Sequence, residues 1–353
     1  MIMGGNALIY MSENINYSQI YQKFTKNLNP KAKDIFARRF GVKTGNPETL
    51  EAIGKTFGIT RERVRQIEEA GFNIIRKNNK EALEAIFADF EAYFNERGGF
   101  KKEEKILEEL GGKRQKPYVL FLLTLGERFS RVCEKKDYHY FWSNMPEAAL
   151  KVKETLGELA SEMKKIGKPV APQNFYSEVA SKIGLSEKAA MSYLEVSKKI
   201  QPNSDGVLGL IEWPEIKPRG VKDKAFLVFK KHQKPLHFTQ VASLIDELRG
   251  EDLDKKTYPQ TVHNELIKDP RFVLVGRGTY ALAEWGYVPG TIKDIISKVL
   301  QEKSEPMQKD ELVNKVLAQR LVAKNTVLMN LNNKKYFEKD ERERYFLKGV
   351  KTA

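Results

Sequence analysis

The chain has 353 residues, with 61 Lys and Arg against 47 Asp and Glu, so its formal net charge is +14. This basic balance favours a polyanionic partner, because clustered cations release counterions when they meet phosphate. A single cysteine, Cys133, excludes an internal disulfide and a cysteine-based metal cage, the four histidines lack metal-ligand spacing, and no apolar run is long enough to cross a membrane.

The first predicted element pair is a helix-turn-helix within residues 46–69, with the sequence NPETLEAIGKTFGITRERVRQIEE. Leu50, Ile53 and Phe57 recur at helical spacing and predict the first helix. Gly58 suits the tight turn that follows, because glycine tolerates a positive φ angle. Thr60 can cap the second helix, since its hydroxyl can accept from a backbone N–H group in the first turn.

The second predicted helix offers a polar face for base recognition. Val64 and Ile67 are three residues apart and are expected to point inward. The opposite face carries the candidate base-contacting residues Arg61, Glu62, Arg65 and Gln66. Arginine suits guanine, glutamine suits adenine and glutamate suits the cytosine amino group, and each such contact discriminates by about 1–3 kcal/mol. The alternative is a solvated helix face whose charges merely pair with one another.

Charge is concentrated around this motif. Residues 28–80 hold twelve Lys or Arg and six Asp or Glu, a surplus of six positive charges in a short stretch. Helix-turn-helix geometry places the second helix in the major groove and its surroundings against phosphates. The candidate phosphate-contacting residues are Arg38, Arg39, Lys55, Thr60, Arg63, Arg76 and Lys77.

A repeat follows in the remainder of the chain. Trp142, Trp213 and Trp285 are separated by 71 and 72 residues, and the words LIEW (210–213) and LAEW (282–285) resemble each other. In each copy, predicted helices precede two short strands, which is the order of a winged helix. Around Trp142 only a hairpin is predicted, from strands at 128–133 and 138–142, and the final copy lacks a tryptophan.

The expected fold class is therefore mainly α with small β wings: a helix-turn-helix domain followed by an array of tandem winged-helix modules. The segments 214–220 and 288–290 are rich in proline and glycine and predict linkers. The predicted domains are an N-terminal extension at 1–27, the helix-turn-helix at 28–80, winged-helix modules at 81–146 and 147–216, and two C-terminal winged helices at 221–287 and 289–350.

The run LNPKAKDIFARRFG (28–41), followed by TLEAIGK (49–55) and TRERVRQIE (60–68), resembles region 4 of the sigma-70 family. In that family, region 4 recognises the −35 promoter element and docks on the flap of the RNA polymerase β subunit. The resemblance thus implies duplex DNA and polymerase core as partners, with Arg61, Glu62, Arg65 and Gln66 as base readers. Only 27 residues precede the motif, and nothing downstream resembles the region that melts the −10 element, so we do not expect a standalone sigma factor.

A second resemblance covers about 222–286. The words KPLHF (234–238) and RFVLVGRGTYAL (271–282), with Trp285, resemble the HARE-HTH winged helix, a module found in the delta subunit of RNA polymerase, in some restriction systems and in chromatin proteins. Its GRG turn at 276–278 predicts a hairpin tip. Arg277 in this tip is a candidate minor-groove contact, or simply a turn arginine, and His237 and Tyr280 are expected to serve packing.

Three function classes compete. The leading hypothesis is a transcription factor that recognises promoter-like DNA and associates with bacterial RNA polymerase. The alternative is a polymerase accessory or nucleoid-type scaffold with nonspecific DNA binding and a steep salt dependence. An enzyme is disfavoured, because the sequence lacks paired carboxylates, a nucleophile elbow and a phosphate-binding glycine loop. We expect no catalytic residues, metal, cofactor or signal peptide, and a cytoplasmic location in the bacterial cytosol or nucleoid.

Overall fold

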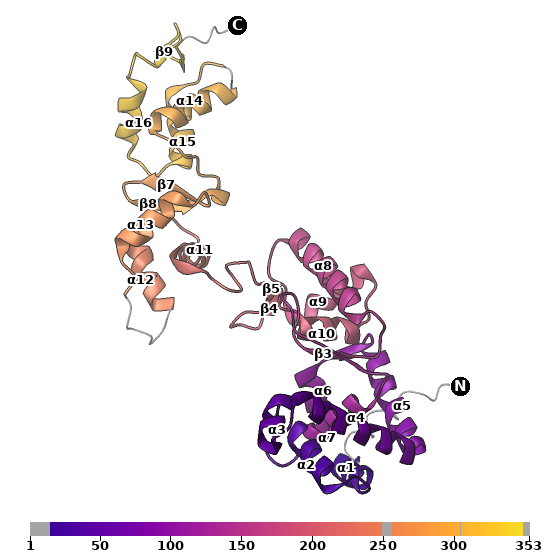
Figure 1. The fold of residues 1–353 in the computed structure, drawn as a ribbon. Helices are drawn as coiled ribbons and strands as arrows, with labels where there is room; N and C mark the ends of the chain where they lie inside the picture. Colours follow the sequence, from indigo (N-terminus) through magenta and orange to yellow (C-terminus); the bar gives the residue numbers. More distant parts are fainter. Residues whose placement is uncertain (1–14, 249–255, 304, 349–353) are drawn as a thin grey trace, which may run out of the picture. The chain divides into compact units, whose positions relative to one another are not determined.

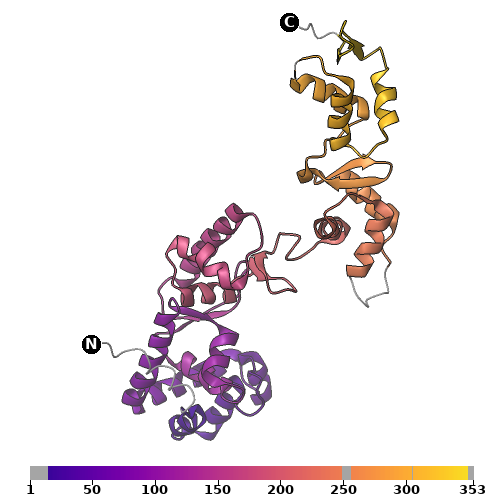
Figure 2. The same ribbon diagram turned by 180° about the vertical axis from the view of Figure 1, so that it is seen from behind.

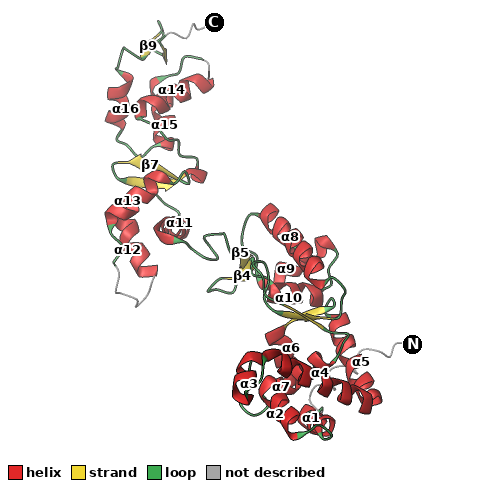
Figure 3. Ribbon diagram, viewed as in Figure 1, coloured by secondary structure: helices red, strands yellow, loops and turns green. Residues whose placement is uncertain are grey.

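The computed structural model describes residues 15–248, 256–303 and 305–348 (Figure 1). The chain divides into two compact units, residues 1–212 and 213–353. Helices dominate both units and the sheets are small and antiparallel (Figure 3), so the predicted mainly α fold class is confirmed. Among the described residues, no helix combines the length and the apolar character that a membrane span requires.

The first unit contains two groups of helices, which lie on either side of a three-stranded sheet (Figure 1). Its elements are α1 (Tyr17–Thr25), α2 (Pro30–Arg39), α3 (Leu50–Phe57), α4 (Arg61–Asn78), α5 (Lys80–Glu96), β1 (Phe100–Lys102), α6 (Glu103–Gly111), α7 (Lys116–Leu125), β2 (Ser130–Val132), β3 (Phe141–Ser143), α8 (Ala148–Ile166), α9 (Pro172–Glu178), the 3-10 helix η1 (Ala180–Ile183), α10 (Glu187–Val196), β4 (Ile200–Pro202) and β5 (Leu208–Leu210).

One aromatic core joins the helices of the N-terminal group. Phe121 of α7 lies against Phe36 of α2, with ring centroids 6.0 Å apart, and against Tyr21 of α1 at 5.0 Å. Tyr17, Tyr21 and Phe24 are all buried in the same core. The predicted N-terminal extension is therefore corrected for α1, which is an integral part of this core. The core also crosses residue 80, because α4 and α5 both contribute buried side chains to it.

The sheet between the helical groups has the order β1-β3-β2. The predicted hairpin is present, with Val132 of β2 opposite Phe141 of β3. The sequence pattern did not reveal β1, which pairs with the other edge of β3. Trp142 lies within β3, and its indole N–H donates to the Glu103 carboxylate at 2.9 Å.

The second helical group, α8 to α10, is completed by the β4–β5 hairpin. Helix α10 packs against β1, where the rings of Tyr193 and Phe100 meet edge to face at 4.7 Å. Beside them, the Lys101 ammonium lies 2.9 Å from a carboxylate oxygen of Glu195. The predicted modules 81–146 and 147–216 therefore share an extensive interface.

The second unit consists of two three-helix modules, each with a small sheet (Figure 2). Its elements are α11 (Gly220–His232), β6 (Leu236–His237), α12 (Phe238–Leu248), α13 (Pro259–Lys268), β7 (Phe272–Gly276), β8 (Thr279–Leu282), the 3-10 helix η2 (Ala283–Trp285), α14 (Ile292–Lys303), α15 (Lys309–Gln319), α16 (Lys324–Leu331), β9 (Phe337–Lys339) and β10 (Tyr345–Leu347).

The two modules of this unit have separate cores and one backbone contact between them, in which the N–H of Leu321 donates to the carbonyl of Val275 at 3.1 Å. Each winged-helix tryptophan from the matched words stands three residues after a strand end: Trp213 follows β5 and Trp285 follows β8. Trp142 departs from this pattern because it lies inside a strand.

Candidate nucleic-acid interface

The helix-turn-helix is formed by α3 and α4, and local caps define its ends. The Thr49 hydroxyl accepts from the Ala52 N–H at 3.1 Å and begins α3. Gly58 ends α3 with φ near +62°, as the sequence predicted. The Thr60 hydroxyl accepts from the Arg63 N–H at 3.2 Å and begins α4. The hydroxyl of Thr60 is thus occupied as a cap, which fixes where the recognition helix starts.

A small core holds the two helices at this angle. Ile35, Ile53 and Val64 are fully buried and pack together. Gly54 lets the turn approach α3 closely, because a Cβ atom there would lie 2.6 Å from the Ile59 carbonyl oxygen. The residues on the outward face of α4 are consequently displayed on a rigid support.

All four candidate base-contacting residues are exposed on the first two turns of α4. Glu62 and Arg65 form a forked pair, in which Nη2 and Nε of Arg65 donate to the carboxylate at 2.9 and 3.1 Å. The hydrogen bond from Arg65 holds the pKa of Glu62 below its usual value, so the carboxylate stays ionised. Glu62 occupies the side edge of the guanidinium, which leaves its end, with Nη1, directed away from the pair. That end can donate two parallel hydrogen bonds to a guanine.

The remaining two base-contacting candidates differ in how they are held. Gln66 accepts at its side-chain carbonyl from Arg63 Nη1 at 3.0 Å, so its amide N–H groups face solvent with one partner already in place. Arg61 makes no ion pair within the described part of the chain. Arg61 is therefore the cation of this face that is most available to an anionic ligand.

Two open hollows flank the recognition helix. One, of about 390 Å³, lies at the N-terminus of α3 and is lined by Arg39, Thr49, Leu50, Glu51 and Arg61. The other, of about 550 Å³, lies at the turn and is lined by Gly54, Lys55, Gly58, Ile59, Thr60 and Arg63. Lys55 and Arg63 thus border a common depression, while Lys55 also pairs with Glu51 at 3.1 Å. The sequence analysis missed the first hollow, for which Thr49 as a helix cap was the available signal.

Two of the predicted phosphate contacts are tied into the domain. Arg39 donates to the buried Glu68 carboxylate at 3.3 Å and to the Glu48 carbonyl at 3.1 Å, which links α2 to α4. Burial raises the pKa of Glu68, although the charge of Arg39 opposes this. Arg38 pairs with Asp34 at 3.2 Å and with Glu48 at 3.6 Å. Both arginines are half-buried, and their first role is to hold the helix-turn-helix together.

Arg76 has a structural position rather than the predicted phosphate contact. Its Nε donates to the Leu125 carbonyl at 3.1 Å and its Nη1 lies 3.1 Å from the Glu127 carboxylate. These bonds connect α4 to the end of α7, so we do not propose a DNA contact for Arg76. Lys77 is exposed, and no ion pair of it occurs in the described ranges. It lies about 20 Å along the helix from Arg63, at 1.5 Å per residue.

The HARE-like segment places Arg277 at the tip of the β7–β8 hairpin, as predicted. Gly278 has φ near +65°, and a Cβ atom there would lie 2.5 Å from the ring of His237, so only glycine fits. Arg277 is exposed and makes no ion pair with any described residue. His237 and Tyr280 lie where packing was expected: His237 stacks on Phe238 at 4.5 Å and Tyr280 is buried.

Comparison with known proteins agrees with both resemblances. Residues 26–77 match the family model of sigma-70, region 4, and residues 219–285 match that of HARE-HTH, the restriction endonuclease HTH domain. Both are helix-turn-helix families of DNA-binding type, and neither match indicates a catalytic family. Three or more metal-ligating side chains do not converge anywhere in the described ranges.

The curated relatives are sigma factors. The RNA polymerase sigma factor SigA of Nostoc sp. is 37% identical over 62 residues, which are 18% of this chain and 16% of that protein. SigA1 of Synechococcus elongatus and SigA of Microcystis aeruginosa are each 39% identical over 56 residues, which are 16% of this chain and 14% of each relative. The chain thus spans about a sixth of the length of the relatives it matches. Over this segment, the similarity supports a DNA-binding, sigma-like role.

Proposed function

We propose that this protein is a DNA-binding transcription factor that recognises promoter-like, −35-like duplex DNA through the first turns of α4 and acts in association with bacterial RNA polymerase. The observation that carries the proposal is the exposed face of Arg61, Glu62, Arg65 and Gln66 on a capped helix above a fully buried core. Its sigma-like sequence lies in the same segment.

The two hollows suggest how the duplex would be held. With the first turns of α4 in the major groove, Arg61 and the N-terminus of α3 border one hollow, and Lys55 and Arg63 border the other. Backbone phosphates on either side of the groove would fit these two positions, since helix N-termini and guanidinium groups both favour anions. The pair of Glu62 and Arg65 would then select a guanine between them.

The contact with polymerase, proposed for the β-subunit flap, is limited by the core. The rear of α2 and α4 is filled by α1 and α7, as the ring distance of 6.2 Å between Phe72 and Phe121 indicates. A partner protein must therefore use the exposed surface of the domain, such as that around Lys31 and Lys33 on α2. A polymerase accessory or scaffold with nonspecific DNA binding is the alternative that the test must distinguish.

The test uses point variants, because deletion of the residues before Lys80 would remove α1, α2 and α4 from the common core. Arg65→Ala in the full chain should weaken the preferred duplex about 5- to 150-fold and relax discrimination at one base pair. The matched control Lys77→Ala removes an exposed cation from the same helix and should affect all sequences equally.

The measurement is selection from random duplexes at physiological salt, with capture of polymerase core in parallel. An enriched motif that Arg65→Ala alters at one position, together with polymerase capture, supports the proposal. Equal and sequence-independent losses in both variants would refute specific recognition and favour the scaffold. Enrichment without capture would refute the polymerase association alone.

A further inference from the structure

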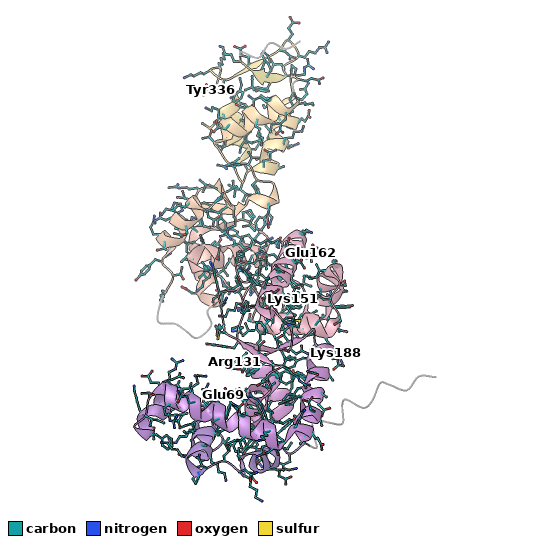
Figure 4. All side chains as sticks on the ribbon, turned by 45° about the vertical axis from the view of Figure 1, so that its right-hand side comes forward. Glu69, Arg131, Lys151, Glu162, Lys188 and Tyr336 are labelled. Atoms are coloured by element: carbon teal, nitrogen blue, oxygen red, sulfur yellow. The ribbon has the colours of Figure 1, made fainter. Side chains whose placement is uncertain are left out.

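The third helix of a winged-helix module is available to DNA only where the rest of the chain leaves it uncovered. In α10 it is covered: Lys188 pairs with Glu96, Tyr193 lies against Phe100, and a Cβ atom on Gly98 would lie 2.9 Å from the Ala189 methyl. Figure 4 labels Lys188 at this junction. The outward face of α10 thus serves contacts within the unit.

The corresponding helix of the C-terminal module, α16, has the opposite character. Val327 and Leu331 point into the module core and are buried. Asn325, Thr326 and Met329 are spaced three or four residues apart on the other face, and Met329 is 75% exposed. Figure 1 shows α16 along the outside of the module that it forms with α14 and α15.

The surface that continues from α16 is basic. Residues 324–335 contain three lysines and four asparagines but neither Asp nor Glu. The ammonium groups of Lys293 and Lys335 lie 4.4 and 5.6 Å from the ring centroid of Tyr336, which Figure 4 labels. Lys334 is exposed beside them. Three cations around one ring repel one another, and an anionic partner would relieve that repulsion.

The hairpin beyond this surface contributes less charge. Lys339 pairs with Glu343, and Arg344 pairs with Asp340 at 2.7 Å, so these cations are already neutralised. Arg342 is exposed at the same turn and has no ion pair to a described residue. Lys324 keeps a weak exposed pair with Asp310 at 3.4 Å.

We propose that α16 and the lysines after it form a second binding site for duplex DNA, separate from the helix-turn-helix. The helix would face the major groove, where the Asn325 amide can both donate and accept and Met329 can contact a thymine methyl group. Lys334, Lys335 and Arg342 would bind backbone phosphates. Charge complementarity and the amide-bearing helix face together favour DNA over an acidic protein, whose recognition would not need the amides.

The test is the salt dependence of binding by the full chain to a random-sequence duplex. Lys334→Gln with Lys335→Gln should reduce the slope of log K against log salt by about 2, since each lost phosphate contact removes about 0.9. The matched control is Lys151→Gln with Lys153→Gln, which removes two exposed lysines from α8. The same comparison in the Arg65→Ala background separates this site from recognition by α4.

A second measurement does not depend on charge. Met329→Cys in a Cys133→Ser background allows a DNA-cleaving reagent to be tethered to α16, since Cys133 is the chain's only cysteine and is exposed. Strand cleavage in the bound duplex and a slope change confined to the Lys334/Lys335 variant support the proposal. A slope equal to that of wild type, an equal loss in the control, or no cleavage would overturn it.

Discussion

Lys101 is the side chain whose removal should damage the first unit most directly. It is 5% exposed, and its ammonium lies 2.9 Å from carboxylate oxygens of both Glu109 and Glu195. The other oxygen of Glu195 is buried without a hydrogen-bond partner in the described structure. In Lys101→Met the side chain keeps its length but loses its charge, so two carboxylates are left at the junction of β1, α6 and α10.

The expected cost follows from these surroundings. Removal of one partner from a buried ion pair costs about 3–5 kcal/mol. Glu109 retains a hydrogen bond from Tyr93 at 2.6 Å and Arg97 at 3.7 Å, which places the loss near the lower end, about 3 kcal/mol. For a unit of this size, a loss of that magnitude lowers Tm by roughly 6–12 °C.

The pH dependence provides a second, independent signature. Burial raises the pKa of Glu109, but the hydrogen bonds from Tyr93 and Lys101 outweigh it, so this pKa lies below its ordinary value of 4.5. The stabilisation is therefore complete above pH 4.5 and is lost as the pH falls through the folded-state pKa. The deficit of Lys101→Met should shrink over the same range, because its unpaired carboxylates become neutral.

The assay is urea and thermal unfolding of the full chain at pH 7 and across the acidic range. Lys151→Met on α8 serves as the control, because this lysine is exposed and its replacement should change the stability by less than about 0.5 kcal/mol. A loss below about 1 kcal/mol for Lys101→Met, or a deficit that does not change with pH, would refute the assignment of this network.

Two further substitutions test the packing of each unit. Gly71→Ala should destabilise by about 1–3 kcal/mol in urea unfolding, despite the higher helix propensity of alanine, because the new Cβ atom would lie 2.7 Å from the ring of Phe36. Arg271→Leu should cost the second unit about 3 kcal/mol, since Arg271 holds both Asp223 at 2.8 Å and Asp269 at 2.6 Å. The hydrogen bond from Arg271 holds the pKa of Asp269 below its ordinary value of 3.8, so this contribution should be lost as the pH falls below 3.8, in a pH titration of the thermal midpoint.

Each of these has a clear contrary result. A stabilised Gly71→Ala variant would mean that α2 and α4 can separate without cost. For Arg271→Leu, a deficit that persists unchanged at pH 3 would mean that packing rather than charge pairing is lost.

The amino-acid sequence alone determined the local features of this protein. Gly58 and Thr60 predicted the turn and the helix start because these preferences act within a few residues. The inward positions of Val64 and Ile67 followed from helical period, and so did the exposure of Arg61, Glu62, Arg65 and Gln66 on the opposite face. The hairpins and the two similar words around Trp213 and Trp285 were visible for the same reason.

Only the tertiary structure decided which charged and polar faces are free. Arg39 and Arg76 look like phosphate ligands in the sequence, but Glu68 and the Leu125 carbonyl, each far away in the chain, hold them. Likewise α10 and α16 occupy equivalent places in their modules, yet β1 covers one and the other is exposed. Ion pairs and interfaces depend on partners that no local pattern specifies, because folding brings together residues that are distant in the sequence.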